Sequence, residues 1–233
     1  MSSAYGHANA GGVNAYYERP ATIALLGEVT GRRVLEVGCG PGSLTRWLAD
    51  HGAVVTAMDV SPEMVRLARE RTGGRAEVLL ADLAEPLTFA ADGSMDLVVA
   101  SLVLHYVADW HPVLREFHRV LAPGGMAVFS THHPSMDWQL HSPDDYFAVR
   151  QVTETWALVG GPFEVTFWRR PLTAMTAAIA AADFVIDRLV EPEPAPQLGE
   201  QDPEADARLQ TSPAFLFFRL AKRGWAQLVP PAQ

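Results

Sequence analysis

The sequence predicts an α/β fold in which a parallel sheet carries helices on both faces. Short apolar runs alternate with amphipathic helical patterns along most of the 233 residues, an order typical of strand–helix–strand units. A glycine-rich loop joins the first apolar run to the helical pattern after it. Acidic residues follow or end the next two runs, at the sheet edge where open α/β sheets bind ligands.

The first half of the chain contains five predicted strands, at residues 33–37, 54–59, 76–80, 95–101 and 126–131. The fourth run is mainly apolar, which indicates burial on both faces. Residues 84–94 lack either periodicity and are expected to form a loop.

One helix is predicted before the first strand, at residues 21–29, and three between the strands, at residues 43–50, 63–71 and 110–121. Pro20 suits the first turn of the first helix, because its missing N–H would have no helical partner there. Ser61 and Asp109 are expected to act as N-cap residues, since their side chains accept hydrogen bonds from free backbone N–H groups. Pro123-Gly124-Gly125 is expected to end the last helix.

The second half is less regular. Residues 134–150 are expected to form a loop, and residues 191–206, rich in proline and acid, an exposed excursion. Two β-rich segments on either side of Gly160-Gly161 predict a hairpin. The remaining predicted elements are hairpin strands 152–158 and 163–169, a helix at 172–182, and strands at 184–190 and 214–221.

Composition limits the classes of partner and compartment. The net charge is −9, which disfavours a nucleic-acid partner because phosphate backbones attract clustered Lys and Arg. No apolar run approaches the roughly 20 residues that span a bilayer. Residues 1–14 are polar and lack a signal-peptide core. Cys39 is the single cysteine, so we expect no internal disulfide and a cytoplasmic protein. As to oligomeric state, we expect a monomer or a homodimer.

The glycine-rich loop is the most informative motif. Glu36 precedes Gly38, Gly40 and Gly42, so glycine stands at every second position. Glycine lets a backbone turn sharply and a ligand approach closely. The dinucleotide fingerprint needs the spacing G-x-G-x-x-G, which this loop does not have, so a nicotinamide oxidoreductase is disfavoured.

The stretch from Val34 to Leu44 resembles motif I of the class I S-adenosylmethionine (SAM) dependent methyltransferases, of the small-molecule, type 11-like kind. The resemblance extends over about residues 15–224. It implies a Rossmann-like seven-stranded sheet with helices on both faces and an antiparallel last strand between its neighbours. It also implies a helical N-terminal lid and makes the hairpin an insertion after strand five.

This resemblance divides the chain into four parts. We expect a lid at residues 1–30, a SAM-binding core at 31–133, a substrate-covering insertion at 134–170 and the rest of the core sheet at 171–233.

The resemblance implies SAM as cofactor, with S-adenosylhomocysteine as product and no metal. Gly38 and Gly40 would leave room for the methionine part and the ribose. Asp59 would accept the ribose hydroxyls, a role that suits a carboxylate about 20 residues past the loop. The remaining cofactor candidates are Val60 and Met64 beside the adenine, Asp82 at its amino group with Leu83, and Ala100 and Ser101 near the methionine chain.

Two further cofactor candidates have alternative roles. Glu36 either contacts the ligand or only orients the glycine loop. Tyr17 either packs on the sulfonium as part of the lid, because aromatic faces attract cations, or packs a surface helix on the sheet.

Three histidines are candidates for catalysis, because a neutral imidazole accepts a proton near pH 7. His133 is the first choice, since the resembled enzymes have a histidine before this proline. His132 and His105 are the others, with a hydrogen-bonded turn or a packing role as alternatives. Cys39 is not expected to act as a nucleophile, because no base is placed beside it in the sequence.

The resemblance thus implies an enzyme that transfers a methyl group from SAM to an oxygen, nitrogen or carbon of a small molecule, possible acceptors including an aromatic or secondary metabolite. Two alternatives keep the fold and the ligand. One is a cyclase or decarboxylase, and the other is a non-catalytic subunit that activates a partner.

Overall fold

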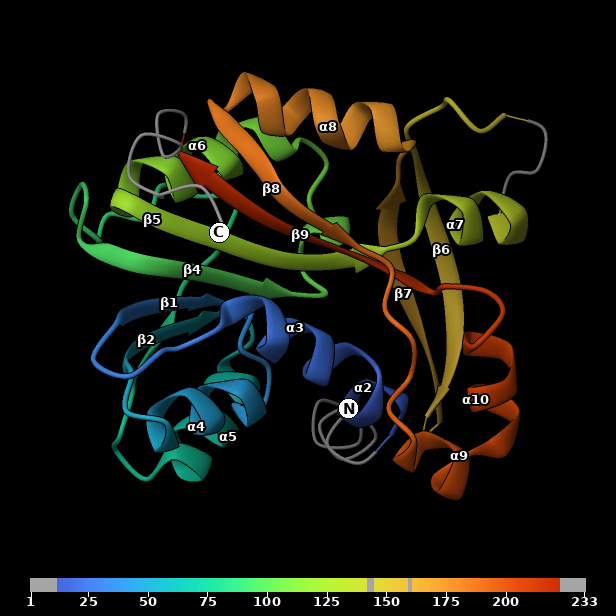
Figure 1. Ribbon diagram of the computed structural model, residues 1–233, viewed down its shortest axis with the longest axis horizontal. Helices are drawn as coiled ribbons and strands as arrows, with labels where there is room; N and C mark the ends of the chain where they lie inside the picture. The colour runs from blue at the N-terminus through green and yellow to red at the C-terminus, as the bar shows by residue number, and fades with distance from the viewer. Residues whose placement is uncertain (1–11, 142–144, 159–160, 223–233) are drawn as a thin grey trace, which may run out of the picture.

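The computed structural model describes residues 12–141, 145–158 and 161–222. A seven-stranded sheet with the order β3-β2-β1-β4-β5-β9-β8 forms its centre (Figure 1). The strands are β1 Arg33–Val37, β2 Val54–Asp59, β3 Glu77–Leu80, β4 Met95–Ser101, β5 Leu121–His132, β8 Phe184–Val190 and β9 Phe215–Lys222.

The direction of the strands confirms the predicted topology. β1 to β5 pair in parallel, whereas β9 runs antiparallel between β5 and β8. The parallel register brings the carboxyl ends of β1, β2 and β4 to one edge, where the first loop and the acidic residues of the sequence motifs lie.

Helices cover both faces of the sheet (Figure 1). One face packs its apolar side chains against α3 Glu18–Leu26, α4 Ser43–Asp50 and α5 Pro62–Thr72. The other face packs against α6 Trp110–Val120 and α8 Leu172–Ala181. Both cores contain mainly aliphatic and aromatic residues of the central strands, so the sheet is buried on both sides as the apolar pattern predicted.

The predicted helix starts have the expected caps. The Ser61 hydroxyl accepts a hydrogen bond from the Met64 N–H at 3.4 Å, and the Asp109 carboxylate accepts one from the His111 N–H at 2.9 Å. Pro62 occupies the first position of α5. Helix α3, however, begins at Glu18, so Pro20 is its third residue, a position still within the first turn, where proline is tolerated.

The predicted hairpin forms a separate two-stranded sheet of β6 Arg150–Leu158 and β7 Gly161–Arg169. Its strands pair antiparallel, with Thr153 opposite Thr166. Gly160 of the predicted turn lies outside the described residues. The hairpin stands at the carboxyl edge of the main sheet, with α7 beside it (Figure 1).

Two predicted loops contain helices, and these predictions were wrong. Helix α7 Pro134–His141 occupies part of the segment 134–150, because Pro134 fits a first helical turn and the Asp137 N–H bonds to the His133 carbonyl. Helices α9 Gln197–Gln201 and α10 Pro203–Leu209 occupy the segment expected to be an exposed excursion.

The second of these errors has a local cause. The Asp202 side chain caps α10 by accepting a hydrogen bond from the Ala205 N–H at 3.0 Å, and Leu198 and Leu209 are buried. The acidic and proline-rich composition masked these few apolar residues. Short elements complete the fold: α2 Val13–Tyr16 and the 3-10 turn η1 Leu104–Tyr106.

Gly42 supports a stability prediction. Its φ is +78°, and a Cβ there would lie 2.8 Å from the Ala68 Cα in α5. We expect Gly42→Ala to lower the free energy of unfolding by about 3 kcal/mol, because strained backbone and a backbone clash add. Guanidinium unfolding measures this. Gly73→Ala is the control, since Gly73 has φ +59° but no atom within 4 Å of its Cβ position; equal losses would contradict the clash.

Candidate functional site

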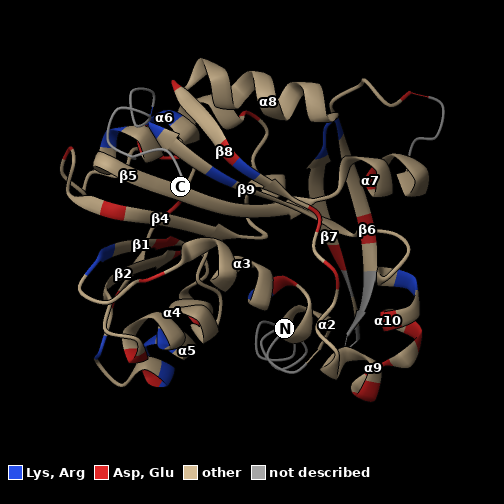
Figure 2. Ribbon diagram, in the orientation of Figure 1, with Lys and Arg blue, Asp and Glu red and all other residues tan. Residues whose placement is uncertain are grey.

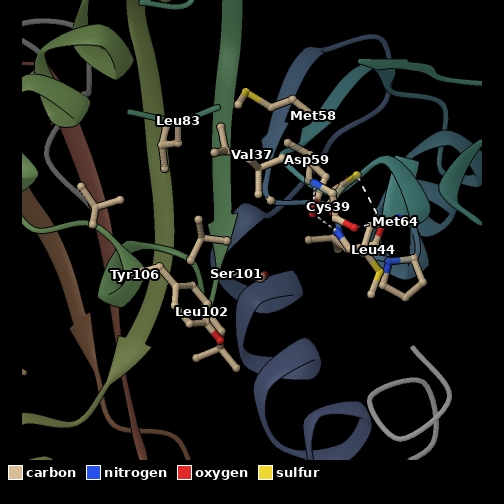
Figure 3. Close-up of a pocket in the computed structure, with 18 of the residues that line it drawn as sticks. Val37, Cys39, Leu44, Met58, Asp59, Met64, Leu83, Ser101, Leu102 and Tyr106 are labelled. Atoms are coloured by element: carbon tan, nitrogen blue, oxygen red, sulfur yellow. Dashed lines mark hydrogen bonds between the residues drawn. The ribbon is translucent and has the colours of Figure 1, made fainter. Parts of the chain in front are cut away.

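A cavity of about 790 Å³ opens at the carboxyl ends of β1, β2 and β4. Figure 3 shows Asp59, Cys39 and Met64 grouped on one side of it and Leu102 and Tyr106 on the other. The predicted cofactor residues among those lining it are Glu36, Gly38, Gly40, Asp59, Val60, Met64, Asp82, Leu83 and Ser101. The structure thus brings together side chains that are up to 65 positions apart in the sequence.

The glycine loop has a conformation that only glycine allows without strain. Gly38 and Gly40 have φ values of +66° and +53°, in the left-handed region. A Cβ on Gly38 would lie 2.2 Å from the Val103 Cγ2. The missing side chain therefore lets Val103, which follows β4, pack directly against the loop after β1. No atom lies within 4 Å of the Cβ position of Gly40, so the open space along this loop is at Gly40.

Asp59 joins two of the loops that line the cavity. Its Oδ2 accepts a hydrogen bond from the Gly40 N–H at 2.9 Å, and its Oδ1 accepts one from the Ser61 N–H at 2.9 Å. Asp82, past the end of β3, accepts a hydrogen bond from the Ala84 N–H at 2.9 Å. Each carboxylate is held in place by backbone N–H groups and keeps further acceptor capacity for a ligand.

Glu36 is buried at the floor of the cavity, with 3% of its surface exposed. Its Oε2 has no hydrogen-bond partner. Burial, with smaller contributions from the charges of Asp59 and Glu18, raises the pKa of this carboxyl to about 8. Glu36 therefore binds a proton at neutral pH.

The end of β4 forms another part of the wall. Ser101 lines the cavity, and its buried Oγ has no partner. Ala100 is fully buried and does not line it. Leu102 has a φ of +52°, and its N–H donates to the Ser130 Oγ at 2.9 Å. This strained turn directs the backbone around the cavity.

Tyr17 does not line the cavity. Its ring is buried against Phe215, with centroids 5.5 Å apart, and its hydroxyl accepts a hydrogen bond from the Ala214 N–H at 3.1 Å. It packs with Leu198 and Leu209 of α9 and α10. In this structure Tyr17 anchors the N-terminal segment, as in the packing alternative.

Other residues of the N-terminal segment line the cavity instead. They are Asn14, Glu18 and Arg19, which sequence reasoning did not single out. The predicted lid and Tyr17 marked the segment, but its helical phase decides which side chains face inward, and α3 begins earlier than predicted. Also missed were cavity-lining residues around η1 and in the hairpin, namely Val103, Tyr106, Val107, Glu164 and Thr166.

None of the three candidate histidines is among the described residues that line the cavity. Both ring nitrogens of His133 are engaged: Nδ1 accepts a hydrogen bond from the Ser135 N–H at 3.2 Å, and Nε2 lies 2.7 Å from Glu191 Oε1. This arrangement corresponds to the hydrogen-bonded turn histidine and leaves no ring nitrogen for an acceptor.

His105 and His132 stack on each other, with ring centroids 3.9 Å apart. His132 Nδ1 lies 3.3 Å from Asp137 Oδ1, and Phe167 of β7 packs its ring edge against His132. Burial, with the charges of His132 and Arg170, holds the pKa of His105 well below its ordinary value. His105 is therefore neutral and lies behind Tyr106, its neighbour in the cavity wall.

The described ranges contain no cluster of three or more His, Cys, Asp or Glu side chains placed to hold a metal ion. Among the described helices, none combines the length and hydropathy of a membrane span. Cys39 is buried, and burial raises the pKa of its thiol, so this side chain is an unreactive part of the wall.

Comparisons with known proteins agree with this geometry. A family model described as a methyltransferase domain matches residues 35–129. A malonyl-[acyl-carrier protein] O-methyltransferase of Pseudescherichia vulneris is 39% identical over 109 residues, which cover 47% of this chain and 42% of that protein. The chain spans about half the length of the first curated relatives it matches, between 42% and 53% of each.

Two longer matches cover more of both chains. A SAM-dependent methyltransferase structure from Mesorhizobium loti superposes with a TM-score of 0.69 at 29% identity, over 88% of this chain and 97% of that one. An uncharacterized methyltransferase of Synechocystis is 35% identical over 155 residues, or 65% of this chain and 70% of that protein. The chain therefore belongs to the class I SAM-dependent methyltransferases.

Proposed function

We propose that this protein binds SAM in the cavity and transfers its methyl group to an oxygen, nitrogen or carbon of a small molecule. One observation carries the proposal: the glycine loop, Asp59 and Asp82 come from three strand ends and line the same cavity. Family membership supports the same activity.

The residues present fit the cofactor. The open space at Gly40, where no atom lies within 4 Å of the Cβ position, would admit the part of the cofactor that lies along the glycine loop. Asp59 and Asp82 would accept hydrogen bonds from the ribose hydroxyls and the adenine amino group. Val60, Met64 and Leu83 would flank the adenine, and Ser101, with the backbone of Ala100, would border the methionine chain.

Glu36 fits the cationic end of the same ligand. Its Oε2 is buried without a partner, and burial raises the pKa of the carboxyl by more than the charge of Arg19 lowers it. An ammonium group near Glu36 would favour the ionised form. We infer that Glu36 loses its proton when SAM binds, and so contributes to ligand binding as well as to the shape of the loop.

The chemistry asks little of the protein. Bound SAM would supply the methyl group of its sulfonium, and the sulfur would leave as a neutral thioether. The chain must exclude water and hold the acceptor in line with the methyl group. The walls around η1 and β7 would do this, because Val103, Val107 and Val165 present apolar surface to the cavity.

His132 does not line the cavity, so we propose it as a positioning residue that does not touch the acceptor, with Asp137 beside its Nδ1 to orient the ring. His105 would act through its stacking on His132, as a positioning residue. His133 is not proposed for catalysis, since both of its ring nitrogens are engaged.

A small-molecule acceptor is the class we propose. The matched P. vulneris relative is named for an acceptor carried on a protein, but the chain spans only part of that enzyme. The acidic balance of the sequence disfavours nucleic acid. We further propose a cytoplasmic protein, monomeric or homodimeric, whose single cysteine suits a reducing compartment.

The alternatives that keep the ligand are separated by product analysis. Formation of S-adenosylhomocysteine identifies methyl transfer. SAM binding without its consumption would favour a cyclase or decarboxylase that uses the cofactor electrostatically, or a subunit that activates a partner.

The cofactor site is tested by Asp59→Asn. We expect the affinity for S-adenosylhomocysteine, measured by titration calorimetry, to fall by about 1–3 kcal/mol, or roughly 5- to 150-fold, because the amide weakens both the ribose contacts and the bridge between loops. Asp96→Asn is the control: Asp96 pairs with Arg33 at the opposite edge of the sheet. Unchanged affinity in Asp59→Asn would rule out this binding mode.

The raised pKa of Glu36 predicts a pH dependence of stability. Between its ordinary pKa of 4.5 and about 8, Glu36 binds a proton only in the folded state, so its contribution to stability falls as the pH rises through this range. We compare the free energy of unfolding of Glu36→Gln with that of the unmodified protein. The difference should shift in favour of Glu36→Gln by on the order of 2 kcal/mol when the pH is raised from 5.5 to 7.5.

Chemical unfolding at the two pH values measures this gain. The control is Glu70→Gln, because Glu70 is exposed and pairs with Arg66 at the surface. This variant should show no such pH-dependent difference from the unmodified protein. Parallel stability curves for Glu36→Gln and the unmodified protein would mean that Glu36 is ionised in the cavity.

A structural role for His133 predicts a different result. We expect His133→Gln to lower the free energy of unfolding by about 1 kcal/mol, because the hydrogen bond to Glu191 is lost. The affinity for S-adenosylhomocysteine should stay within about twofold, since His133 does not line the cavity. A tenfold loss of affinity without loss of stability would contradict this assignment.

A further inference from the structure

We propose that the Glu18 carboxylate selects the methyl acceptor, so that the site prefers an uncharged or positively charged molecule with an N–H or O–H group and rejects anions. This inference rests on the proposed function, because it concerns the part of the cavity left for the acceptor. Glu18 belongs to α3, outside all the motifs that the sequence resemblance identified.

The acceptor part of the cavity lies between α3, η1 and β7. The glycine loop, Asp59 and Asp82 occupy the other part, and Leu102 and Tyr106 stand across the cavity from Asp59 (Figure 3). Apolar walls come from the η1 side and from β7. Two carboxylates, Glu18 and Glu164, also line this part, and Figure 2 shows acidic positions at the beginning of α3 and in β7.

The Glu18 carboxylate is held in a fixed position. Its Oε1 accepts hydrogen bonds from the Thr22 Oγ1 and from the Ser130 Oγ, each at 2.7 Å. The side chain is buried, with 5% of the residue exposed. Ser130 Oγ also accepts the Leu102 N–H, so the carboxylate is tied to the strained turn after β4.

These contacts leave acceptor capacity on the carboxylate. An ionised carboxylate has about four lone-pair sites and no donor, and the hydrogen bonds from Thr22 and Ser130 both end on Oε1. Glu18 lines the cavity, so a ligand there can reach it only by donating a hydrogen bond. A hydroxyl or amine does so, whereas a carboxylate or phosphate meets a like charge.

The charge of the described lining residues points in the same direction. Five of them carry a carboxyl group, and Arg19 carries the one guanidinium. Arg19 lies within electrostatic range of both Glu18 and Glu36, whose charges raise its pKa against the larger lowering by burial. An excess of negative charge therefore remains even with Glu36 protonated and a sulfonium ligand bound, and it disfavours a second anion.

Fragment binding to the full chain loaded with S-adenosylhomocysteine tests this selectivity. The probes are benzylamine, benzyl alcohol and benzoate, together with a library of monocyclic amines, phenols and carboxylic acids in equal numbers. Ligand-observed NMR at pH 7.5 measures the binding of each probe. We expect amines and uncharged donors to bind at least tenfold more tightly than carboxylates of the same size.

The variant Glu18→Gln should reduce this preference to less than threefold. Its amide oxygen still accepts the hydrogen bonds from Thr22 and Ser130, so we expect the fold to persist, and the thermal midpoint checks this. Glu28→Gln, the same change at an exposed loop position after α3, should keep the preference of the unmodified protein. The affinity for S-adenosylhomocysteine should stay within threefold in both variants.

Three results would overturn the inference: carboxylates binding as tightly as amines, a preference that persists in Glu18→Gln, or no fragment binding at all. A tenfold loss of S-adenosylhomocysteine affinity in Glu18→Gln would also overturn it, because Glu18 would then serve the cofactor. Failure of the unmodified protein to bind S-adenosylhomocysteine would overturn the proposed function instead. The charge preference would then be measured on the unliganded protein.

Discussion

The bridge that Asp59 makes between the loops after β1 and β2 is the interaction on which the site depends. The carboxylate accepts hydrogen bonds from the N–H groups of Gly40 and Ser61. The two loops, about 20 residues apart in the sequence, are therefore held at a fixed distance. The parallel register places them at one sheet edge, and the carboxylate fixes their relative position there. Glycine at position 40 leaves the space beside this bridge open, because no atom lies within 4 Å of its Cβ position.

Charge organises the cavity in a second way. Carboxyl groups gather where a cationic ligand is expected, and each has a different environment. Asp59 is satisfied by backbone N–H groups, Glu18 by two hydroxyl groups, and Glu36 has a buried oxygen without a partner. These different environments are consistent with so many acidic groups in one small cavity, since the least solvated of them, Glu36, is protonated at neutral pH.

The central sheet and the part of the cavity lined by the glycine loop, Asp59 and Asp82 could be predicted from the sequence, because strand periodicity and the glycine loop are local signals. The residues around η1 and in β7 that complete the cavity could not. Their placement depends on how the hairpin and α3 pack on the sheet. His133 shows the same limit: its position before Pro134 attracted attention, but its engagement with Glu191 comes from a segment 58 residues away. Helices α9 and α10 were missed since so few apolar residues mark them.

The contacts of Tyr17 have a consequence for how ligands reach the cavity. Its hydroxyl is bonded to the backbone just before β9, and its ring packs with α9 and α10. Helix α3, which begins at the next residue, carries Glu18 and Arg19 into the cavity wall. Any displacement of α2 and α3 must break these contacts of Tyr17 or carry α9 and α10 along. The segment that places Glu18 and Arg19 in the cavity wall is therefore coupled to the C-terminal helices through Tyr17.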